Sequence, residues 1–250
     1  MLSRILRSGF LVVATALALG LSAWGQCSNA SVTGKYGFAS GGLDKNGNPI
    51  RVLGYFKANG KGKFTGTETV SDNGSVVINV PITGTYSVNS DCTGSGTTTP
   101  KGGKASHYSL VVVSGGKNLQ FLITDSPNVQ AGTAQAQGKA TCTVGGIKGN
   151  FGVEASGVFI GVGAVAFDGL FTLDGKGNVS GTESGSVAGS IFTGQSVSGT
   201  YTVASNCTGT MTLMVEGQTE HTSFVVTNGG QSLLVVETDT STVVSGFGQQ

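Results

Sequence analysis

The segment Gly84-Thr-Tyr-Ser-Val-Asn-Ser-Asp-Cys-Thr-Gly94 occurs a second time in this chain of 250 residues, as Gly199-Thr-Tyr-Thr-Val-Ala-Ser-Asn-Cys-Thr-Gly209. Eight of the eleven positions are identical, and the two segments are separated by 115 residues. A long match at a fixed shift indicates a repeated structural unit. The sequence therefore predicts two copies of one domain, over residues 26–138 and 139–250.

Other matches extend the repeat over nearly the whole chain. Cys27 matches Cys142, and residues 59–68 match residues 174–183, at the same shift of 115. After the second cysteine of each copy the shift falls to 114, and His107 then matches His221. The chain is thus interpreted as a tandem duplication whose boundary lies near residues 138–141.

Turn-forming residues divide each copy into short segments, which predicts an all-β fold. Clusters rich in Gly, Asn and Asp recur in the first copy, at residues 44–49, 59–60, 72–74, 89–91, 101–103, 114–116 and 126–128. Seven such turns separate eight strands joined in sequence, the pattern of an up-and-down antiparallel barrel. We therefore expect two tandem eight-stranded barrels. Two β-sandwiches are the alternative, but they require a long crossing connection, for which no segment is evident.

The four cysteines favour one disulfide within each copy. Each copy carries two cysteines at the same spacing, and a bond that arose in a single ancestral domain must be internal to it. The expected pairs are Cys27–Cys92 and Cys142–Cys207. A zinc site is the competing interpretation, but the short Cys-x-x-Cys spacing typical of such sites is absent.

The first 25 residues have the pattern of a signal peptide. Arg4 and Arg7 precede an uncharged apolar stretch, and Ala23-Trp24-Gly25 places small residues where a signal peptidase cleaves. The apolar stretch is shorter than the ~20 residues of a spanning helix, although a retained single-pass anchor is the alternative. We expect an exported protein, periplasmic, cell-surface or extracellular, without stable membrane insertion after an N-terminal signal helix is removed.

The net charge of residues 26–250 is close to zero, so the protein is not polybasic. The net charge differs between the two copies. Residues 26–250 carry twelve Lys and Arg against thirteen Asp and Glu, so neither nucleic acid nor an anionic membrane is an expected partner. The first copy has nine basic and five acidic residues, the second three and eight. Domains of opposite sign attract, which favours a compact pair or head-to-tail association.

The segment 84–94 and its copy at 199–209 resemble a motif of uncharacterised bacterial exported proteins that contain one or two such repeats. The resemblance covers nearly the whole chain after residue 25, and it implies no known activity. The eight-stranded outline is also similar in topology to small barrels of the allene-oxide-cyclase/dirigent and lipocalin-like types. No functional residue of those families can be matched to a position here.

Strand alternation places a few polar residues on the apolar inner face. Phe64, Glu68 and Val70 share one side of a strand, and Tyr86 lies on the apolar side of the next. Leu119, Phe121 and Ile123 alternate along one strand, and the same alternation places Asp125 on their side at the strand end. The resulting candidates for ligand binding are Glu68, Tyr86 and Asp125 in the first copy and Glu183, Tyr201 and Asp239 in the second.

A carboxyl group among apolar residues needs an explanation, because its burial is costly unless it is bonded, paired or protonated. One hypothesis makes Glu68 the polar anchor of a ligand cavity. The structural alternative is that Glu68 binds backbone N–H groups at a bulge near Gly66, or Tyr86, to close the barrel. The single His of each copy, His107 and His221, is interpreted as a surface or hydrogen-bonded residue.

Three functions remain open at this point. The first is a non-enzymatic exported module that binds a small apolar ligand or a cell-envelope partner. The second is a structural or adhesive surface protein with filled barrels. The third is a cyclase- or dirigent-like enzyme that uses Glu68 and Glu183 with Tyr86 and Tyr201. The sequence offers no catalytic, metal-ligand or cofactor motif, and an interior cavity of ~300 Å³ or more would favour ligand binding.

Overall fold

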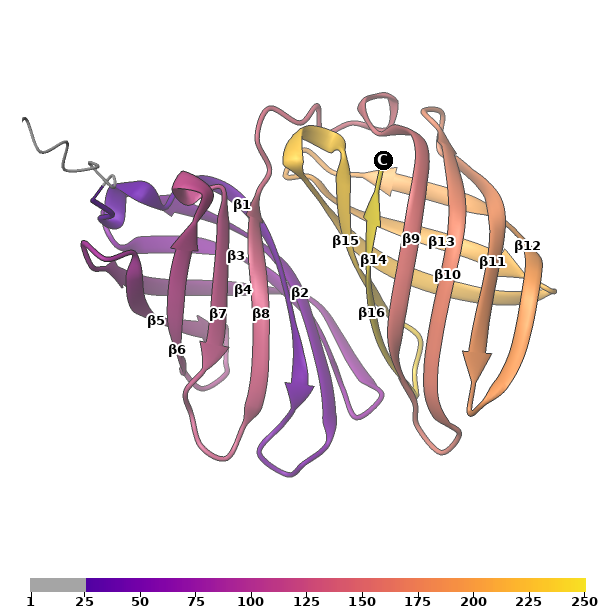
Figure 1. The fold of residues 1–250 in the computed structure, drawn as a ribbon, viewed down its shortest axis with the longest axis horizontal. Helices are drawn as coiled ribbons and strands as arrows, with labels where there is room; N and C mark the ends of the chain where they lie inside the picture. Colours follow the sequence, from indigo (N-terminus) through magenta and orange to yellow (C-terminus); the bar gives the residue numbers. More distant parts are fainter. Residues whose placement is uncertain (1–25) are drawn as a thin grey trace, which may run out of the picture.

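The structure, a computed structural model, describes residues 26–250, so the expected signal peptide lies outside the described residues. The described chain forms two closed barrels, each of eight antiparallel strands joined in sequence (Figure 1). The predicted pair of up-and-down barrels is confirmed, and the sandwich alternative is wrong. Residues 137–147 connect the two barrels.

The strands of the first barrel are β1 (Thr33–Leu43), β2 (Pro49–Asn59), β3 (Lys63–Asp72), β4 (Ser75–Val88), β5 (Thr93–Pro100), β6 (Ser106–Val113), β7 (Asn118–Ile123) and β8 (Val129–Ala136). Those of the second are β9 (Lys148–Phe159), β10 (Gly163–Asp174), β11 (Asn178–Val187), β12 (Ser190–Val203), β13 (Thr208–Val215), β14 (Gln218–Thr227), β15 (Ser232–Glu237) and β16 (Thr242–Gln249). Four short 3-10 helices accompany them: η1 (Asn29–Ser31), η2 (Ser114–Gly116), η3 (Val144–Gly146) and η4 (Asn228–Gly230).

One end of each barrel is plugged by the segment that precedes its first strand. Disulfides Cys27–Cys92 and Cys142–Cys207 tie these segments to the β4–β5 and β12–β13 turns, which confirms the predicted pairing. Disulfides of this kind are typical of proteins in oxidising compartments. Residues 26–250 contain no helix long and apolar enough to cross a membrane.

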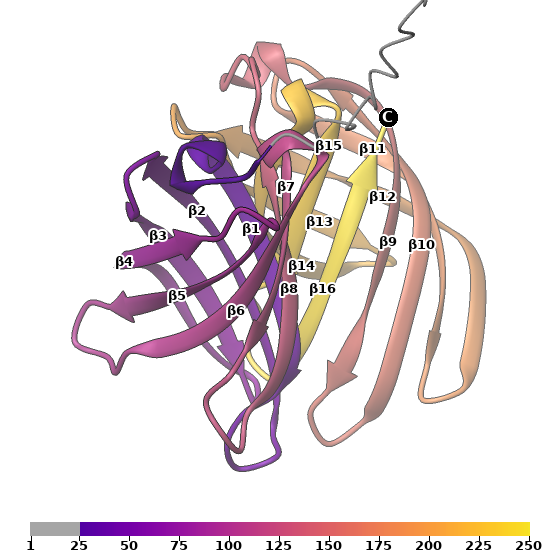
Figure 2. The same ribbon diagram turned by 60° about the vertical axis from the view of Figure 1, so that its left-hand side comes forward.

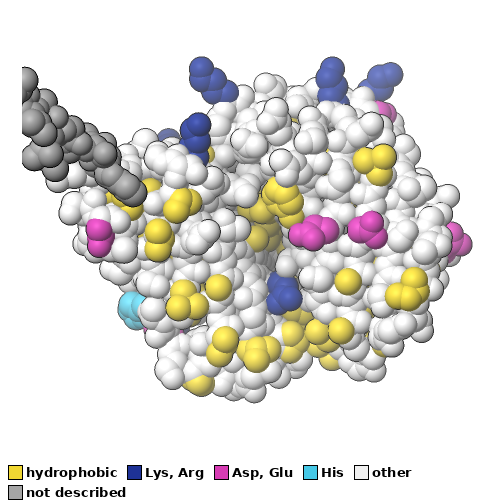
Figure 3. Space-filling model, in the orientation of Figure 1, with side chains coloured by type: hydrophobic (Ala, Val, Ile, Leu, Met, Phe, Trp, Pro, Cys, Tyr) yellow, Lys and Arg dark blue, Asp and Glu magenta, His cyan; other side chains and the backbone are white. Residues whose placement is uncertain are grey.

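The opposite end of each barrel, called the mouth here, is bordered by the alternate set of turns. In the first barrel these turns are residues 44–48, 73–74, 101–105 and 124–128. The mouths lie on the same side of the molecule, at the lower edge of Figure 1. On the face shown in Figure 3, Lys and Arg side chains gather along the upper, plugged ends, and hydrophobic side chains gather near the mouths.

Inward-facing glycines make room for aromatic rings that lie against the wall of the first barrel. The Phe38 ring covers Gly54 so closely that a Cβ there would lie 2.4 Å from it, and the Tyr108 ring covers Gly96 in the same way. Phe64 over Gly84 and Phe121 over Gly132 repeat the arrangement. Because glycine has no Cβ, these rings lie close to the wall, and they line the space in the middle of the barrel.

The two barrels pack side by side through their outer faces (Figure 2). Leu53 on β2 is buried against three residues of β14 and β15, namely Val225, Leu234 and Val236. The opposite net charges of the two copies therefore do not make the contact. Apolar side chains make it together with a few hydrogen bonds, such as that between Thr227 and Gln135, and no Lys–Glu or similar ion pair joins the barrels within residues 26–250.

Backbone hydrogen bonds also connect the first barrel, or the segment directly after it, to the second barrel at both ends. At the mouths the Ser241 N–H donates to the Gly74 carbonyl at 2.8 Å, and at the plugged ends the Gly229 N–H donates to the Gln137 carbonyl at 3.0 Å. The contact joins unlike faces, because β1–β2 of one barrel meet β14–β16 of the other. The strands equivalent to β1–β2 in the second barrel, β9–β10, remain on its free side (Figure 1).

Candidate ligand-binding cavities

The first barrel contains a cavity of about 390 Å³. It runs from Val32 and Tyr86 at the plugged end to Asp44, Lys45 and Asn128 at the mouth. Between these ends the wall is mainly apolar. Its aromatic members are Phe38, Phe56, Phe64, Tyr86, Tyr108 and Phe121.

Glu68 is the acidic residue in the middle of this wall. The pairing of β3 with β4 shifts register between Glu68 and Val70, and on the other side Glu68 lies opposite Gly54 of β2. Burial raises the pKa of Glu68 from its ordinary 4.5 to about 7. Its carboxyl group accepts no hydrogen bond from the part of the chain that the structure describes, and it lines the cavity, as strand alternation predicted.

The second barrel retains a cavity of only about 80 Å³. On β13 two larger side chains point into this interior. Register places Met211 opposite Tyr201 where the first barrel has Gly96 opposite Tyr86. In the same way Leu213 takes the place of Thr98. Larger aliphatic side chains from β13 therefore occupy part of the space that is open in the first barrel.

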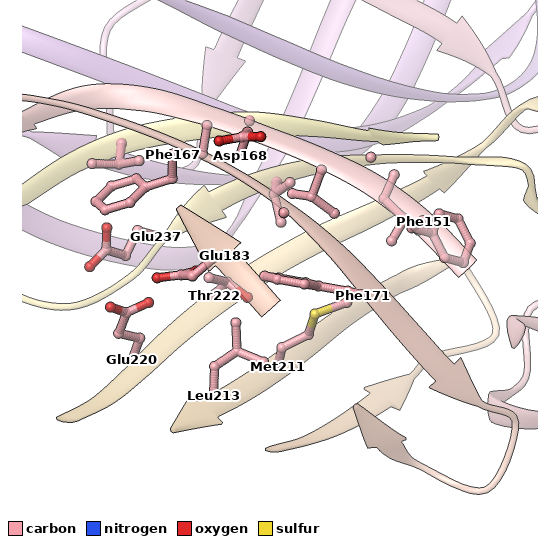
Figure 4. Close-up of a pocket in the computed structure, with 18 of the residues that line it drawn as sticks. Phe151, Phe167, Asp168, Phe171, Glu183, Met211, Leu213, Glu220, Thr222 and Glu237 are labelled. Atoms are coloured by element: carbon pink, nitrogen blue, oxygen red, sulfur yellow. The ribbon is translucent and has the colours of Figure 1, made fainter. Parts of the chain in front are cut away.

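Three glutamates share the interior of the second barrel near its mouth: Glu183 of β11, Glu220 of β14 and Glu237 of β15 (Figure 4). Burial and the neighbouring acids raise the pKa of Glu183 to about 7 and that of Glu237 to about 8. Burial, followed by Asp239, raises the pKa of Glu220. Near neutral pH these groups therefore share protons instead of all being ionised.

Sequence reasoning did not select Glu220 and Glu237. The first barrel has Ser106 and Ile123 at the equivalent strand positions, so these acids do not recur between copies. Only strand alternation could have indicated that they face inward. On β15, for example, Glu237 lies on the same side as Leu233 and Val235.

Tyr86 and Tyr201 hold the plugs and do not bind the glutamates. The Tyr86 hydroxyl donates to the Val32 carbonyl at 2.6 Å. The Tyr201 hydroxyl donates to the Ile147 carbonyl at 2.7 Å and accepts from the Gly175 N–H at 3.0 Å. The proposed bond between Glu68 and Tyr86 is therefore wrong, and Glu68 also accepts no backbone N–H at the bulge.

Asp125 and Asp239 lie at the mouths, outside the two cavity linings. His107 Nδ1 is 2.8 Å from Asp125 Oδ1, and the His107 backbone N–H donates to the other carboxylate oxygen at 2.6 Å. These bonds lower the pKa of Asp125. His221 and Asp239 repeat the arrangement with the same distances. Each pair fastens the mouth end of a hairpin, which agrees with the hydrogen-bonded role expected for the two histidines.

Among the described residues, no group of three His, Cys, Asp or Glu side chains is arranged to hold a metal ion. The carboxyl trio of the second barrel thus has neither a metal geometry nor a basic side chain in its lining. Its negative charge is limited by protonation.

Comparisons with known proteins do not assign a family. No protein-family description matches the chain, and no curated protein matches it significantly. Among solved structures, the chain resembles kievitone hydratase from Nectria haematococca at 10% identity, over 88% of this chain and 90% of that one, with a TM-score of 0.23. A similarity this low carries no argument about function.

Proposed function

We propose that the chain is an exported, non-enzymatic tandem barrel whose first barrel binds a small, mainly apolar ligand. The cavity of about 390 Å³ carries this proposal, because it lies within the range of small-molecule sites and has an apolar wall with few polar groups. The signal-peptide pattern and the two disulfides support export. A cell-envelope component that presents an apolar group is a ligand of the same kind.

The surroundings of the mouth agree with an apolar ligand. Val77, Ile78 and Val129, at the mouth of the first barrel, are 56%, 58% and 65% exposed. Exposed apolar residues around an entrance favour partition of an apolar molecule toward it.

The two other hypotheses are less well supported for the first barrel. The hypothesis of a filled, structural barrel fits the second barrel, whose cavity has about 80 Å³, better than the first. An enzyme that used Glu68 with Tyr86 would need the tyrosine hydroxyl for its substrate. That hydroxyl is instead bonded to backbone carbonyls of the plug.

The second barrel supplies the residues for a test. Gly96→Met, Thr98→Leu and Tyr108→Thr together give the first barrel the residues found at the equivalent positions of the second. N-phenyl-1-naphthylamine, an uncharged fluorescent probe, is titrated into the wild-type protein and into this filled variant. We expect enhanced fluorescence with the wild type and a loss of affinity of at least about tenfold in the filled variant.

Thr99→Leu is the matched control, because Thr99 lies on β5 but faces outward and is exposed. It should bind the probe like the wild type. Thermal unfolding of each variant shows that the barrels remain folded. Equal binding by the wild type and a folded, filled variant would place the probe elsewhere and contradict the proposed function.

A further inference from the structure

The first-barrel cavity has an acidic interior without a basic side chain beside it. Its titratable lining groups are Asp44, Lys45, Glu68, Asp72, Tyr86 and Tyr108. Lys45 is the sole basic residue of this lining, and it lies in the β1–β2 turn at the mouth. The interior itself presents the carboxyl group of Glu68.

The mouth adds two further carboxyl groups, those of Asp44 and Asp72. Asp72 Oδ1 is buried and has no hydrogen-bond partner within residues 26–250. Asp44 and Asp72 face the cavity together with Lys45, so acids outnumber bases along the path from the mouth to Glu68. An anionic ligand would meet repulsion from the mouth inward, whereas a cation would be attracted.

Aromatic rings lie around the Glu68 carboxyl group. Gly54, the β2 partner of Glu68, is covered by the Phe38 ring. That ring contacts Phe56 and Phe121 with centroid distances of 5.9 and 6.5 Å. The faces of aromatic rings attract ammonium groups, and the attraction is strongest where water is excluded.

We infer that the ligand of the first barrel is a lipophilic amine, with an apolar body against the aromatic wall and a protonated amino group paired with Glu68. An amine satisfies the buried carboxylate with both charge and hydrogen bonds. An alcohol supplies a hydrogen bond but leaves the charge uncompensated, and a carboxylic acid adds a second negative charge. This inference rests on the proposed function, since it requires that the cavity bind a small molecule.

A matched series of ligands tests the inference by isothermal titration calorimetry on the full chain without its signal segment. The series is 4-phenylbenzylamine, 4-biphenylmethanol and biphenyl-4-carboxylate, which share one apolar body. Near pH 8, above the pKa of Glu68, we expect the amine to bind at least about tenfold more tightly than the alcohol. The acid should bind most weakly.

Glu68→Gln keeps the size of the side chain and removes its charge. In this variant the amine should bind no better than the alcohol, while the alcohol binds as in the wild type. Glu183→Gln, at the equivalent position of the filled second barrel, is the matched control and should retain the preference for the amine. For the wild type near pH 5, where Glu68 of the ligand-free protein is protonated, the preference should be clearly smaller than near pH 8.

The outcomes separate this inference from the proposed function. If the amine and the alcohol bind the wild type equally well, or if Glu68→Gln keeps the preference for the amine, the inference is wrong and the apolar binding site remains. If no member of the series binds the wild type more tightly than it binds the filled variant, both proposals are wrong.

Discussion

At the scale of single residues, Glu68 makes the stability of the first barrel depend on pH. Its pKa is about 7 in the folded chain, against an ordinary value of 4.5, because burial disfavours the ionised form. The folded state therefore binds the proton more tightly than the unfolded state. This stabilisation is complete below about pH 4.5 and is lost as the pH rises through about 7.

Glu68→Gln should raise the free energy of unfolding near pH 8 and leave it nearly unchanged near pH 4.5. The gain near pH 8 should be at most about 3 kcal/mol, the free energy that corresponds to the raised pKa. Urea unfolding at the two pH values measures it. Glu216→Gln, at an exposed turn, is the control and should show no such dependence. A variant less stable than the wild type at both pH values would mean that the carboxyl group is a structural hydrogen-bond acceptor.

Alternation along the strands was sufficient to place Glu68 and Glu183 inside. It failed for Asp125, because β7 ends at Ile123 and the chain then turns, so the alternation of faces does not continue. The carboxyl trio could not be predicted from recurrence. Glu220 and Glu237 have no acidic counterpart in the first barrel, and the three meet only because barrel closure brings β11, β14 and β15 around one interior.

At the scale of elements, the plug is held by a tyrosine of the fourth strand in each barrel. The Tyr86 hydroxyl lies 2.6 Å from the carbonyl of Val32, which follows η1, and 3.2 Å from that of Asn29, the first residue of η1. The disulfide Cys27–Cys92 joins the same segment to the next turn. The repeated Gly-Thr-Tyr motif is thus explained as the inner anchor of the plug.

Tyr86→Phe should lower the free energy of unfolding by about 1–2 kcal/mol, because buried carbonyls lose their donor. Chemical denaturation under oxidising conditions measures the change. Tyr55→Phe is the control, since the Tyr55 hydroxyl makes no hydrogen bond within residues 26–250. Tyr86→Phe should leave binding of the uncharged probe unchanged. A loss of binding without a loss of stability would assign Tyr86 to the ligand instead of the plug.

The turns of the first copy were predictable because Gly, Asn and Asp mark each hairpin, and all seven predicted turns lie between consecutive strands. The sequence did not predict that the first barrel has a large cavity and that the second is nearly filled. A cavity depends on the summed volumes of side chains from several strands, and exchanging Gly96 for Met211 or Thr98 for Leu213 alters no strand or turn signal.

At the scale of the whole molecule, the contact between the barrels depends on apolar residues that are absent from the equivalent face of the second barrel. Ala39 and Leu53 are paired across β1 and β2 at the contact. The equivalent pair across β9 and β10 is Glu154 and Asp168. The same strands therefore carry an apolar face in one barrel and an acidic face in the other.

Leu53→Asp should separate the barrels, because Leu53 is 2% exposed and the new charge would be buried without a partner. The expected cost is about 3–5 kcal/mol. Scanning calorimetry should show the two barrels unfolding in separate transitions. Leu170→Asp, the same change at a position 53% exposed, is the control and should leave the thermogram unchanged. An unaltered thermogram for Leu53→Asp would contradict the described contact.

Glu154→Ala with Asp168→Leu should produce head-to-tail association that increases with protein concentration. The double variant recreates the β1–β2 face on the second barrel, and it can dock on β6–β8 of another chain, the strands equivalent to β14–β16. That face offers Val111 and Leu122, 42% and 50% exposed. Sedimentation velocity measures the association. Adding Leu122→Asp should abolish it, whereas association that survives this change would use another surface.

The plugged ends also determine how the molecule can be presented. The described chain enters β1 and leaves β16 at this side, where the Gln250 N–H donates to the Gln231 carbonyl at 3.0 Å beside η4. Both attachment points thus lie opposite the two mouths. A protein coupled to a bead or sensor chip through either end of residues 26–250 should stand with both mouths directed into the solution, so immobilisation leaves the entrances accessible without a long spacer.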